Sequence, residues 1–504
     1  MSQVSGSMKP IEGASACDRP VHTGRPDLLQ SKGGALAVFL AIALGTFLLV
    51  AGLSTLKGGV LNILFVIGGL LGIFVLALAV PQVSANYAYL KARLNSWHLV
   101  WYGIYVSSLV FRIRALADFQ EQPVDSWALL RIGPELVIGL YLLGLLALRR
   151  LQWWKSLFTG LPAVLAVYSM FCLLTTFWSV FGAWTFYKSM EFMLDVTVIS
   201  ALLCVISTAE QYKTLFDFTW TVYGIETVWC WMQIAIWPTE ALQDGRLKGV
   251  FPLTAYNALG EYGALLGIVA LARLMPITKG KFRQSWYIAL LGFGIATMIA
   301  AQTRNAIGGV VLAAVLVLVL SRGLTGALMA GLAAGGVIFT ALGALVQNFM
   351  QRGQSDEALE GLSGRLEWWR FAWAQFLDHP IAGLGAYAAG KFAVMKSLNV
   401  NSGSTHSDYI ELLVGTGLVG LVLFVTAIIW TWRLLIGFIR DQACDPLERQ
   451  LALEAFGVMV VLTVHSFFNV ELIWHAPLFF LVVLGYAEFL RRKKAAIALA
   501  RARY

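Results

Sequence analysis

The residues best suited to chemistry lie in the polar segment 347–407, which separates two long apolar runs. His406 stands at the end of this segment, and the next apolar span begins at Asp408. An imidazole has an ordinary pKa of about 6.5 and can accept a proton at neutral pH. We therefore expect His406 to act as a general base. The alternative is a histidine at a helix start that is hydrogen-bonded to water.

Three further side chains could support this imidazole. Asp408 and Glu411 fall in the turn that follows it, where they would orient the ring, raise its basicity, or only favour the positive end of a helix dipole. His465 lies near the same end of a later apolar span. It would either line the same cavity or be a packed, hydrogen-bonded histidine.

Basic residues at similar positions could bind an anion. Arg304 lies in a short polar break, 301–305, where a guanidinium is costly unless it is paired or binds an anion. Its planar fork suits two-point contacts with a phosphate, and otherwise it is a snorkelling anchor. Arg246 and Lys248 precede an apolar span and would form a second cationic arm or part of a solvated loop. Arg365, at a helix start, would be a third anion contact.

The composition indicates that these residues belong to a membrane protein. Of 504 residues, 59% are hydrophobic and 13% are charged, too few charges to cover a soluble domain of this size. Continuous apolar runs of about 18 to 25 residues are typical of membrane-spanning helices and unlike the alternating strands of a barrel. The sequence predicts an all-α, polytopic integral membrane protein, whose net charge of +9 reflects membrane topology and not binding to nucleic acid.

The apolar runs predict about fourteen transmembrane helices. With the N-terminus inside, every inner connection carries at least one Lys or Arg, as the positive-inside rule requires. Both termini are then expected in the cytoplasm and segment 347–407 outside. The expected spans are 35–54, 59–80, 97–112, 127–148, 157–178, 189–207, 213–237, 259–275, 285–301, 305–320, 324–346, 408–432, 451–470 and 474–490.

These spans divide the chain into a cytoplasmic tail at 1–34, transmembrane regions at 35–180, 181–346 and 408–490, the outer loop 347–407, and a basic cytoplasmic tail at 491–504.

Within the outer loop, the apolar residues Leu366, Trp369, Trp373 and Phe376 recur at helical spacing. The dipeptide 379–380, His-Pro, ends that pattern, because a residue before proline avoids the helical region. The sequence therefore predicts an interfacial helix over 365–378 that lies flat on the outer leaflet, with its tryptophans at headgroup depth.

The sequence shows neither a metal motif nor a nucleotide motif. The five cysteines are scattered without a C-x-x-C pair, and Asp356 and Glu357 are adjacent loop acids without further ligands. There is no Gly-rich phosphate loop and no H-E-x-x-H motif. We expect no cofactor and no required divalent ion.

Four segments carry a family likeness: RLKGVFPLTAYNALG (246–260), TRNAIGGVVL (303–312), SGRLEWWRFAWAQFLDHPIAGLGAY (363–387) and HSDYIELLVGTGLVG (406–420). In order and placement they resemble the superfamily of bacterial O-antigen ligases and O-antigen or exopolysaccharide polymerases, which are membrane glycosyltransferases. The family more often has His-Asn where this chain has His406-Ser407, and Ser-Arg where it has Thr303-Arg304. The imidazole and the guanidinium are retained in both places.

The resemblance implies an enzyme of the bacterial inner membrane that takes a glycan from undecaprenyl diphosphate, with loop 347–407 and the active site in the periplasm. It implies His406 as the base for an acceptor hydroxyl. Arg304 and Arg246, with Arg365 or Lys248, would stabilise the diphosphate leaving group. A single displacement would invert the anomeric centre without a metal. Membrane lipids and polysaccharide export proteins are the expected partners.

The acceptor distinguishes the two activities of this superfamily. A ligase transfers the glycan to lipid A–core or to a protein, whereas a polymerase adds it to another lipid-linked repeat. The long N-terminal region and the number of spans favour a polymerase.

Two other functional classes remain open. A transporter or flippase of lipid-linked sugars would place ionisable residues near the bilayer midplane, in broken helices related by repeats. The candidates here cluster at the outer ends of spans, and no repeat is evident. A scaffold subunit of a polysaccharide assembly would not need Arg304 or His406.

Overall fold

The computed structural model describes residues 88–109, 126–275, 284–323, 325–328, 331, 364–400, 402–473 and 477–501, and these are mostly helical. In chain order the elements are α3 (Ser96–Leu109), α5 (Ser126–Ala147), the 3-10 helix η1 (Trp153–Phe158), α6 (Gly160–Leu174), the 3-10 helix η2 (Thr175–Phe177), α7 (Gly182–Val205), α8 (Ala209–Ile236), α9 (Pro238–Ala241), β1 (Leu242–Gln243), β2 (Arg246–Leu247), α10 (Tyr256–Leu274), α11 (Gln284–Ala301), α12 (Arg304–Arg322), α16 (Arg365–Asp378), the π-helix η4 (Gly390–Met395), α17 (Asp408–Arg440), α18 (Pro446–Ser466) and α19 (Leu478–Arg501).

The helical class predicted from the sequence is confirmed over the described residues. Within them, four helices are long and apolar enough to cross a membrane: α5, residues 160–177, α12 and α17. The expected spans 35–54 and 59–80 lie outside the described residues, as does 324–346 except for 325–328 and 331. The total of about fourteen spans and the outer position of the long loop therefore stay predictions.

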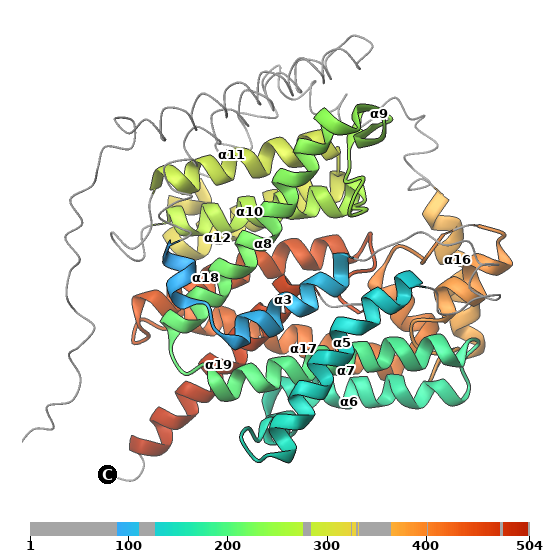
Figure 1. Ribbon diagram of the computed structural model, residues 1–504, viewed down its shortest axis with the longest axis horizontal. Coiled ribbons are helices and arrows are strands. Elements are labelled where there is room, and N and C mark those ends of the chain that lie inside the picture. Colours follow the sequence, from blue (N-terminus) through green and yellow to red (C-terminus); the bar gives the residue numbers. More distant parts are fainter. Residues whose placement is uncertain are drawn as a thin grey trace, which may run out of the picture.

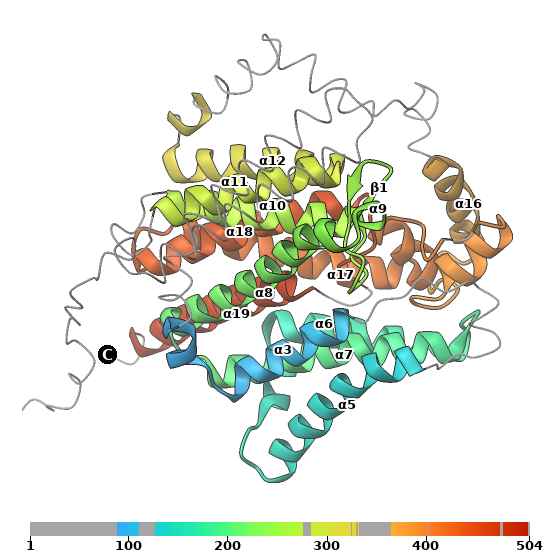
Figure 2. The ribbon, with the colours of Figure 1, turned by 45° about the horizontal axis from the view of Figure 1, so that its top comes forward.

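The three C-terminal helices occupy the middle of the molecule (Figures 1 and 2). α18 packs against α10 and α12 on one side, while α17 packs against α6 and α19 against α7 on the other. α18 is buried along nearly its whole length, which is expected of a helix surrounded by others. Large side chains that fill the core around these helices include Phe192, Phe424, Phe479 and Tyr486.

A buried ion pair joins three of the central helices. The Arg273 guanidinium of α10 donates through Nε to Glu454 of α18 at 2.6 Å and through Nη1 to Asp217 of α8 at 2.5 Å. The side chains of Arg273 and Glu454 are almost fully buried. Inside an apolar protein each charge is tolerated only because the other compensates it, so this contact fixes how the three helices meet.

Two glycines bring α10 and α11 into close contact. A methyl group at Gly263 would lie 2.7 Å from the carbonyl oxygen of Gly294, so neither position has room for a side chain. Helices in membranes associate closely through such small residues. The contact places the end of α11 beside the start of α10, where the functional candidates lie.

The helix predicted over 365–378 is confirmed, because α16 has these bounds. Gly364 precedes it with a φ of 86°, a left-handed conformation that suits glycine, and His379 caps its end. Ala372 and Phe376 are buried against the protein, whereas Trp373 is 50% exposed. The apolar side chains therefore divide between a packed face and an exposed edge. Whether that edge enters a leaflet stays a prediction.

Helix α17 is broken at Gly417, whose φ of 61° and ψ of −159° are not helical. The break frees backbone groups that pair with the segment after α16. Leu384 and Gly385 donate their N–H groups to the carbonyls of Val414 and Gly415 at 2.8 and 2.9 Å. In return Leu418 donates to the carbonyl of Pro380 at 2.8 Å. This pairing joins the end of α16 to α17 and so fixes the loop between them.

Candidate active site

Four helices, α10, α12, α16 and α17, begin at the same end of the molecule. The Thr303 hydroxyl, just before α12, donates to the carbonyl of Tyr256 at the start of α10 at 2.9 Å. The Trp369 indole of α16 donates to the carbonyl of Thr405, just before α17, at 2.9 Å. In Figure 1 α9 and α16 mark this end, on the right. Free N–H groups and dipoles at helix starts favour an anion there.

Arg246 is held against the start of α10. Its Nε donates to the carbonyl of Ala301 at 3.1 Å, and its Nη2 donates to Asn257 Oδ1 at 3.4 Å. The guanidinium carbon lies 3.4 Å from the centre of the Tyr256 ring, which is cation–π stacking. The side chain is thus fixed with its charge over an aromatic face.

Arg304 is a close electrostatic neighbour of Arg246. Burial lowers the pKa of the Arg246 guanidinium, contact with Tyr256 opposes this shift, and the positive charge of Arg304 lowers the pKa further. Two guanidinium groups held within each other's field repel, so an anion between them would be stabilising. The pair has the charge and the N–H donors that a phosphate or diphosphate requires.

Arg365 adds a third guanidinium from α16. Its Nη1 donates to the carbonyl of Phe468 at 2.8 Å, and it lies within the electrostatic reach of the Tyr256 phenol. Burial lowers the pKa of Arg365. Tyr256 is therefore an electrostatic neighbour of both Arg246 and Arg365, and the three arginines expected from the sequence lie at one end of the molecule.

The His406 imidazole lies at the same end. Its Nε2 is 3.3 Å from the Ser402 hydroxyl, and its ring stacks on Trp368 with centroids 5.9 Å apart. Burial, and next the charge of Arg365, lower the pKa of His406 to about 4. The imidazole is therefore neutral at pH 7 and can accept a proton.

The two carboxylates expected to assist His406 bind backbone groups beside it. Asp408 accepts the N–H groups of Glu471 and Leu472 at 3.0 and 3.1 Å. Glu411 accepts the N–H of Thr405 at 2.7 Å. These contacts hold the two loops that flank the imidazole, so both carboxylates shape the site through the backbone.

Lys248 lies on the exposed side of the β1–β2 hairpin. Its ammonium contacts the Gln243 side chain, and its backbone N–H donates to Ala241 at 2.9 Å. The structure thus directs Lys248 toward the hairpin surface, while Arg246 from the same hairpin turns toward Tyr256.

His465 belongs to a buried polar cluster with Glu261, Asn469 and Glu471. Its Nδ1 lies 2.9 Å from Glu261 Oε2 and 3.0 Å from Glu471 Oε1, and its Nε2 lies 3.2 Å from Asn469 Nδ2. One nitrogen and two oxygens so close together can share protons or hold a metal ion. The expectation that no metal is required therefore stays a prediction.

Sequence reasoning did not assign roles to Tyr256, Asn469 or Glu471. The run from His465 to Glu471 carried a signal, since four polar residues within seven positions at the end of an apolar span are unusual. Tyr256 carried none, because its role depends on a hairpin that folds back over it.

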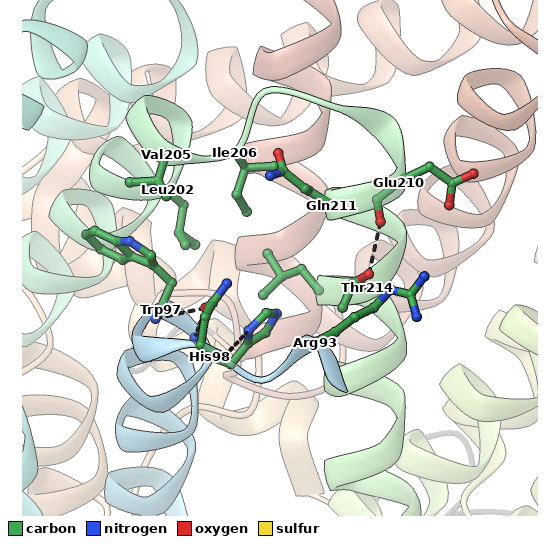
Figure 3. A pocket seen from close by; sticks show the side chains of 11 residues that line it. Arg93, Trp97, His98, Leu202, Val205, Ile206, Glu210, Gln211 and Thr214 are labelled. Atoms are coloured by element: carbon green, nitrogen blue, oxygen red, sulfur yellow. Dashed lines mark hydrogen bonds between the residues drawn. The ribbon is translucent and has the colours of Figure 1, made fainter. Parts of the chain in front are cut away.

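A cavity of about 270 Å³ lies elsewhere in the fold, between the starts of α3 and α8 and the end of α7 (Figure 3). Arg93, His98, Glu210 and Thr214 are among its lining residues. This cavity adjoins the first residues of α8. The candidate site adjoins the β1–β2 hairpin, which follows the C-terminal end of α8. The 28 residues of α8 span about 42 Å. This cavity is therefore separate from the arginine cluster.

Comparison with protein families gives one match. Residues 288–425 match the family model described as O-Antigen ligase. The matched region contains Arg304, Arg365 and His406, whereas Arg246, Lys248 and His465 lie outside it. No curated protein matches the chain. The apolar helices and this match together identify a membrane protein.

Proposed function

We propose, from the match of residues 288–425 to the O-antigen ligase family model, that the protein joins lipid-carrier-linked oligosaccharide repeats into a surface polysaccharide. Members of the family are glycosyltransferase-like enzymes that act on lipid-linked glycans. The proposed donor is a glycan on undecaprenyl diphosphate, and the proposed location is the periplasmic face of the bacterial inner membrane. The observation that carries the proposal is the gathering of Arg246, Arg304 and Arg365 beside His406.

The arginines suit a diphosphate leaving group. When the bond between the anomeric carbon and the diphosphate oxygen breaks, negative charge grows on that oxygen. Cations that are already fixed in place stabilise this charge without reorganising. Arg246 is fixed by Ala301 and Tyr256, and Arg365 by Phe468. We propose that these side chains and Arg304 hold the diphosphate without a metal ion.

His406 suits the acceptor side of the reaction. Its neutral imidazole takes the proton of the acceptor hydroxyl while the oxygen forms a bond with the anomeric carbon. The electron pair of the broken glycosidic bond stays with undecaprenyl diphosphate. A single displacement of this kind inverts the anomeric configuration.

Exposed apolar side chains near the site suit the polyprenyl chain of the donor. Trp373 and Leu377 on α16, Ile381 after it, and Leu418 and Val422 on α17 are all exposed. The backbone pairing between segment 380–385 and α17 keeps these two elements together. We propose that the carrier lipid runs along this surface while its diphosphate meets the arginines.

A ligase is the second candidate function, because the matched family carries that description. Glycan gel profiles of a deletion strain separate the two. Loss of long chains, with single repeats retained, is the result expected of a polymerase. Accumulation of long polymer that is still attached to its carrier would indicate a ligase. An unchanged profile would reject both.

Two measurements test the finer parts of the proposal. Reporter fusions within 347–407 should report a periplasmic location, and a cytosolic location would overturn the proposed orientation. Transfer by the purified protein in liposomes should persist in EDTA. A strict requirement for a divalent ion would overturn the metal-independent mechanism.

A further inference from the structure

We propose that Glu261, His465 and Glu471 form a binding site for one divalent transition-metal ion with the ligand preferences of Zn²⁺. The ion joins α10, α18 and the segment that follows α18. The inference goes beyond the proposed function, which assigns no role to a metal ion. It concerns metal binding and stability, and both can be measured without any transfer reaction.

The three side chains lie close enough together to share one ion. Nδ1 of His465 lies 2.9 Å from Glu261 Oε2 and 3.0 Å from Glu471 Oε1. One donor atom from each residue lies within 4.8 Å of the other two. Two ligand atoms that bind a metal ion at about 2.1 Å and at a right angle are about 3.0 Å apart. The spacing of the imidazole nitrogen and the two oxygens is therefore that of a coordination site.

Nδ1 of His465 is buried without a hydrogen bond. The side chain is completely buried, and Nδ1 forms no hydrogen bond with the described residues, although both carboxylates lie within 3.0 Å of it. At such a short distance a hydrogen bond fails when the acceptor lies well to one side of the N–H direction. A metal ion in line with the Nδ1 lone pair would have its other ligands in this lateral position. The geometry thus suits coordination better than a shared proton.

The charge of the cluster also favours a divalent cation. Among the residues that the structure describes, Glu261 and Glu471 form ion pairs with His465 alone. One imidazolium balances one of the two negative charges, whereas a divalent ion bound to a neutral imidazole balances both. Glu261 is only 3% exposed, so a second uncompensated charge beside it would be costly.

The types of ligand atom select the class of metal. An imidazole nitrogen suits Zn²⁺ and other transition-metal ions, whereas Mg²⁺ and Ca²⁺ prefer oxygen ligands. The three side chains leave further coordination positions for water on the side of Glu471, which is 19% exposed. Nε2 of His465 lies 3.2 Å from the Asn469 amide, an outer contact of the kind that orients metal-binding histidines.

A metal ion at this position would fasten the segment after α18 to two helices. Glu261 belongs to α10, His465 to the last turn of α18, and Glu471 to the segment that follows it. In the same segment the carbonyl of Phe468 accepts a hydrogen bond from Arg365 at 2.8 Å. The ion therefore stabilises the segment that holds Arg365 in place, and its expected role is structural.

The experiment measures the metal content and the thermal stability of the full-length protein in detergent, after removal of any purification tag. Protein stripped with a chelator is incubated with Zn²⁺ or Mg²⁺ and desalted, and its metal content is measured by mass spectrometry. We expect one Zn²⁺ per chain and no retained Mg²⁺. Zn²⁺ at about 100-fold its Kd should raise Tm by about 3–5 °C, because it binds only the folded protein.

Variants assign the bound ion to this cluster. Glu261→Gln and His465→Ala should each lose the ion and the rise in Tm that Zn²⁺ causes. Glu226→Gln is the matched control, since Glu226 is also a buried carboxylate but accepts hydrogen bonds from the hydroxyls of Tyr105 and Thr254. It should keep both. Each variant is compared with and without Zn²⁺ after size-exclusion chromatography, so a general loss of stability is not mistaken for a loss of metal binding.

Three outcomes would overturn the inference. The first is a wild-type protein that retains no more Zn²⁺ than Glu261→Gln. The second is an equal loss of Zn²⁺ from Glu226→Gln, and the third is a Tm that Zn²⁺ leaves unchanged. The fate of the proposed function is separate. Transfer that persists in the stripped protein keeps both proposals, whereas transfer that stops while the stripped protein is still folded keeps the metal site and overturns the metal-independent mechanism.

Discussion

The guanidinium carbon of Arg246 lies 3.4 Å from the centre of the Tyr256 ring, ten residues further along the chain. The hairpin that carries Arg246 folds back over the start of α10, where Tyr256 is the first helical residue. The aromatic face of Tyr256 stacks on Arg246, and the phenol group of the same residue lies within the electrostatic reach of Arg365. Tyr256 thus organises the spacing of two of the three arginines.

The stacking predicts different results for two substitutions of Tyr256. Tyr256→Phe keeps the aromatic face and should leave KM for the lipid-linked donor near the wild-type value. Tyr256→Leu removes the face, and a cation–π contact contributes about 0.5–2 kcal/mol, so KM should rise by about 2-fold to 30-fold. Steady-state kinetics in liposomes measures both. Equal effects of Phe and Leu would contradict the stacking role.

His406→Ala should abolish transfer while the protein still folds and inserts. No proton acceptor remains for the acceptor hydroxyl, whereas Asp408 and Glu411 still hold their backbone partners. Product formation and membrane expression should be measured together. His379→Ala, at the exposed end of α16, is the matched control and should retain activity. Wild-type product levels from His406→Ala would reject the base role.

Arg304→Lys should lower kcat by about 10²-fold to 10³-fold, the usual loss when one donor to a growing negative charge is removed. A lysine keeps the charge but presents a single point in place of a planar fork. The control is Arg322→Lys at the other end of α12, where turnover should be unchanged. Near-normal turnover of Arg304→Lys would make Arg304 a membrane anchor.

The acidic limb of the pH–rate profile should lie near the His406 pKa of about 4, below the ordinary value for histidine. A base acts only when it is unprotonated, so activity persists as the pH falls from 7 and is lost as it passes through that pKa. Arg365→Met removes a neighbouring positive charge, so the pKa should rise and the limb should move to higher pH. A limb that stays in place in this variant would contradict the coupling.

Arg273→Met should destabilise the protein by about 3–5 kcal/mol, because it leaves Asp217 and Glu454 buried without their cation. The substitution weakens the packing of α8 against α10 and α18. The ion pair lies at the end of these helices opposite the arginine cluster. Thermal unfolding in detergent measures it. Arg449→Met is a matched control with a partly buried guanidinium that donates to the carbonyl of Ile439, and its loss should be smaller.

Local patterns in the sequence predicted much of the site. The helix at 365–378 follows from its apolar spacing and the His-Pro end, and α16 has the same bounds. Arg246, Arg304 and His406 lie at the predicted outer ends of spans and Arg365 at the start of the predicted interfacial helix, and the structure places all four at one end of the molecule. The apolar periodicity of a helix, and the side of the membrane that each span end faces, follow from the order of residues along the chain. A single sequence is therefore sufficient to predict them.

The partners of these residues depend on contacts across the chain. Glu261 meets His465 from 204 positions away, and neither residue predicts the other by its type. Asp408 and Glu411 were expected at the ring, but backbone N–H groups of folded loops are stronger competitors for a carboxylate. Such choices arise only when distant segments are packed together.

The break in α17 at Gly417 has a consequence for mutants that carry no change near the arginines. A side chain at Gly417 would collide with the backbone at 381–382. That segment directly follows α16. The collision would be transmitted along the chain to Arg365, more than fifty residues earlier. A substitution at Gly417 could therefore abolish sugar transfer by displacing Arg365, although glycine itself takes no part in the reaction.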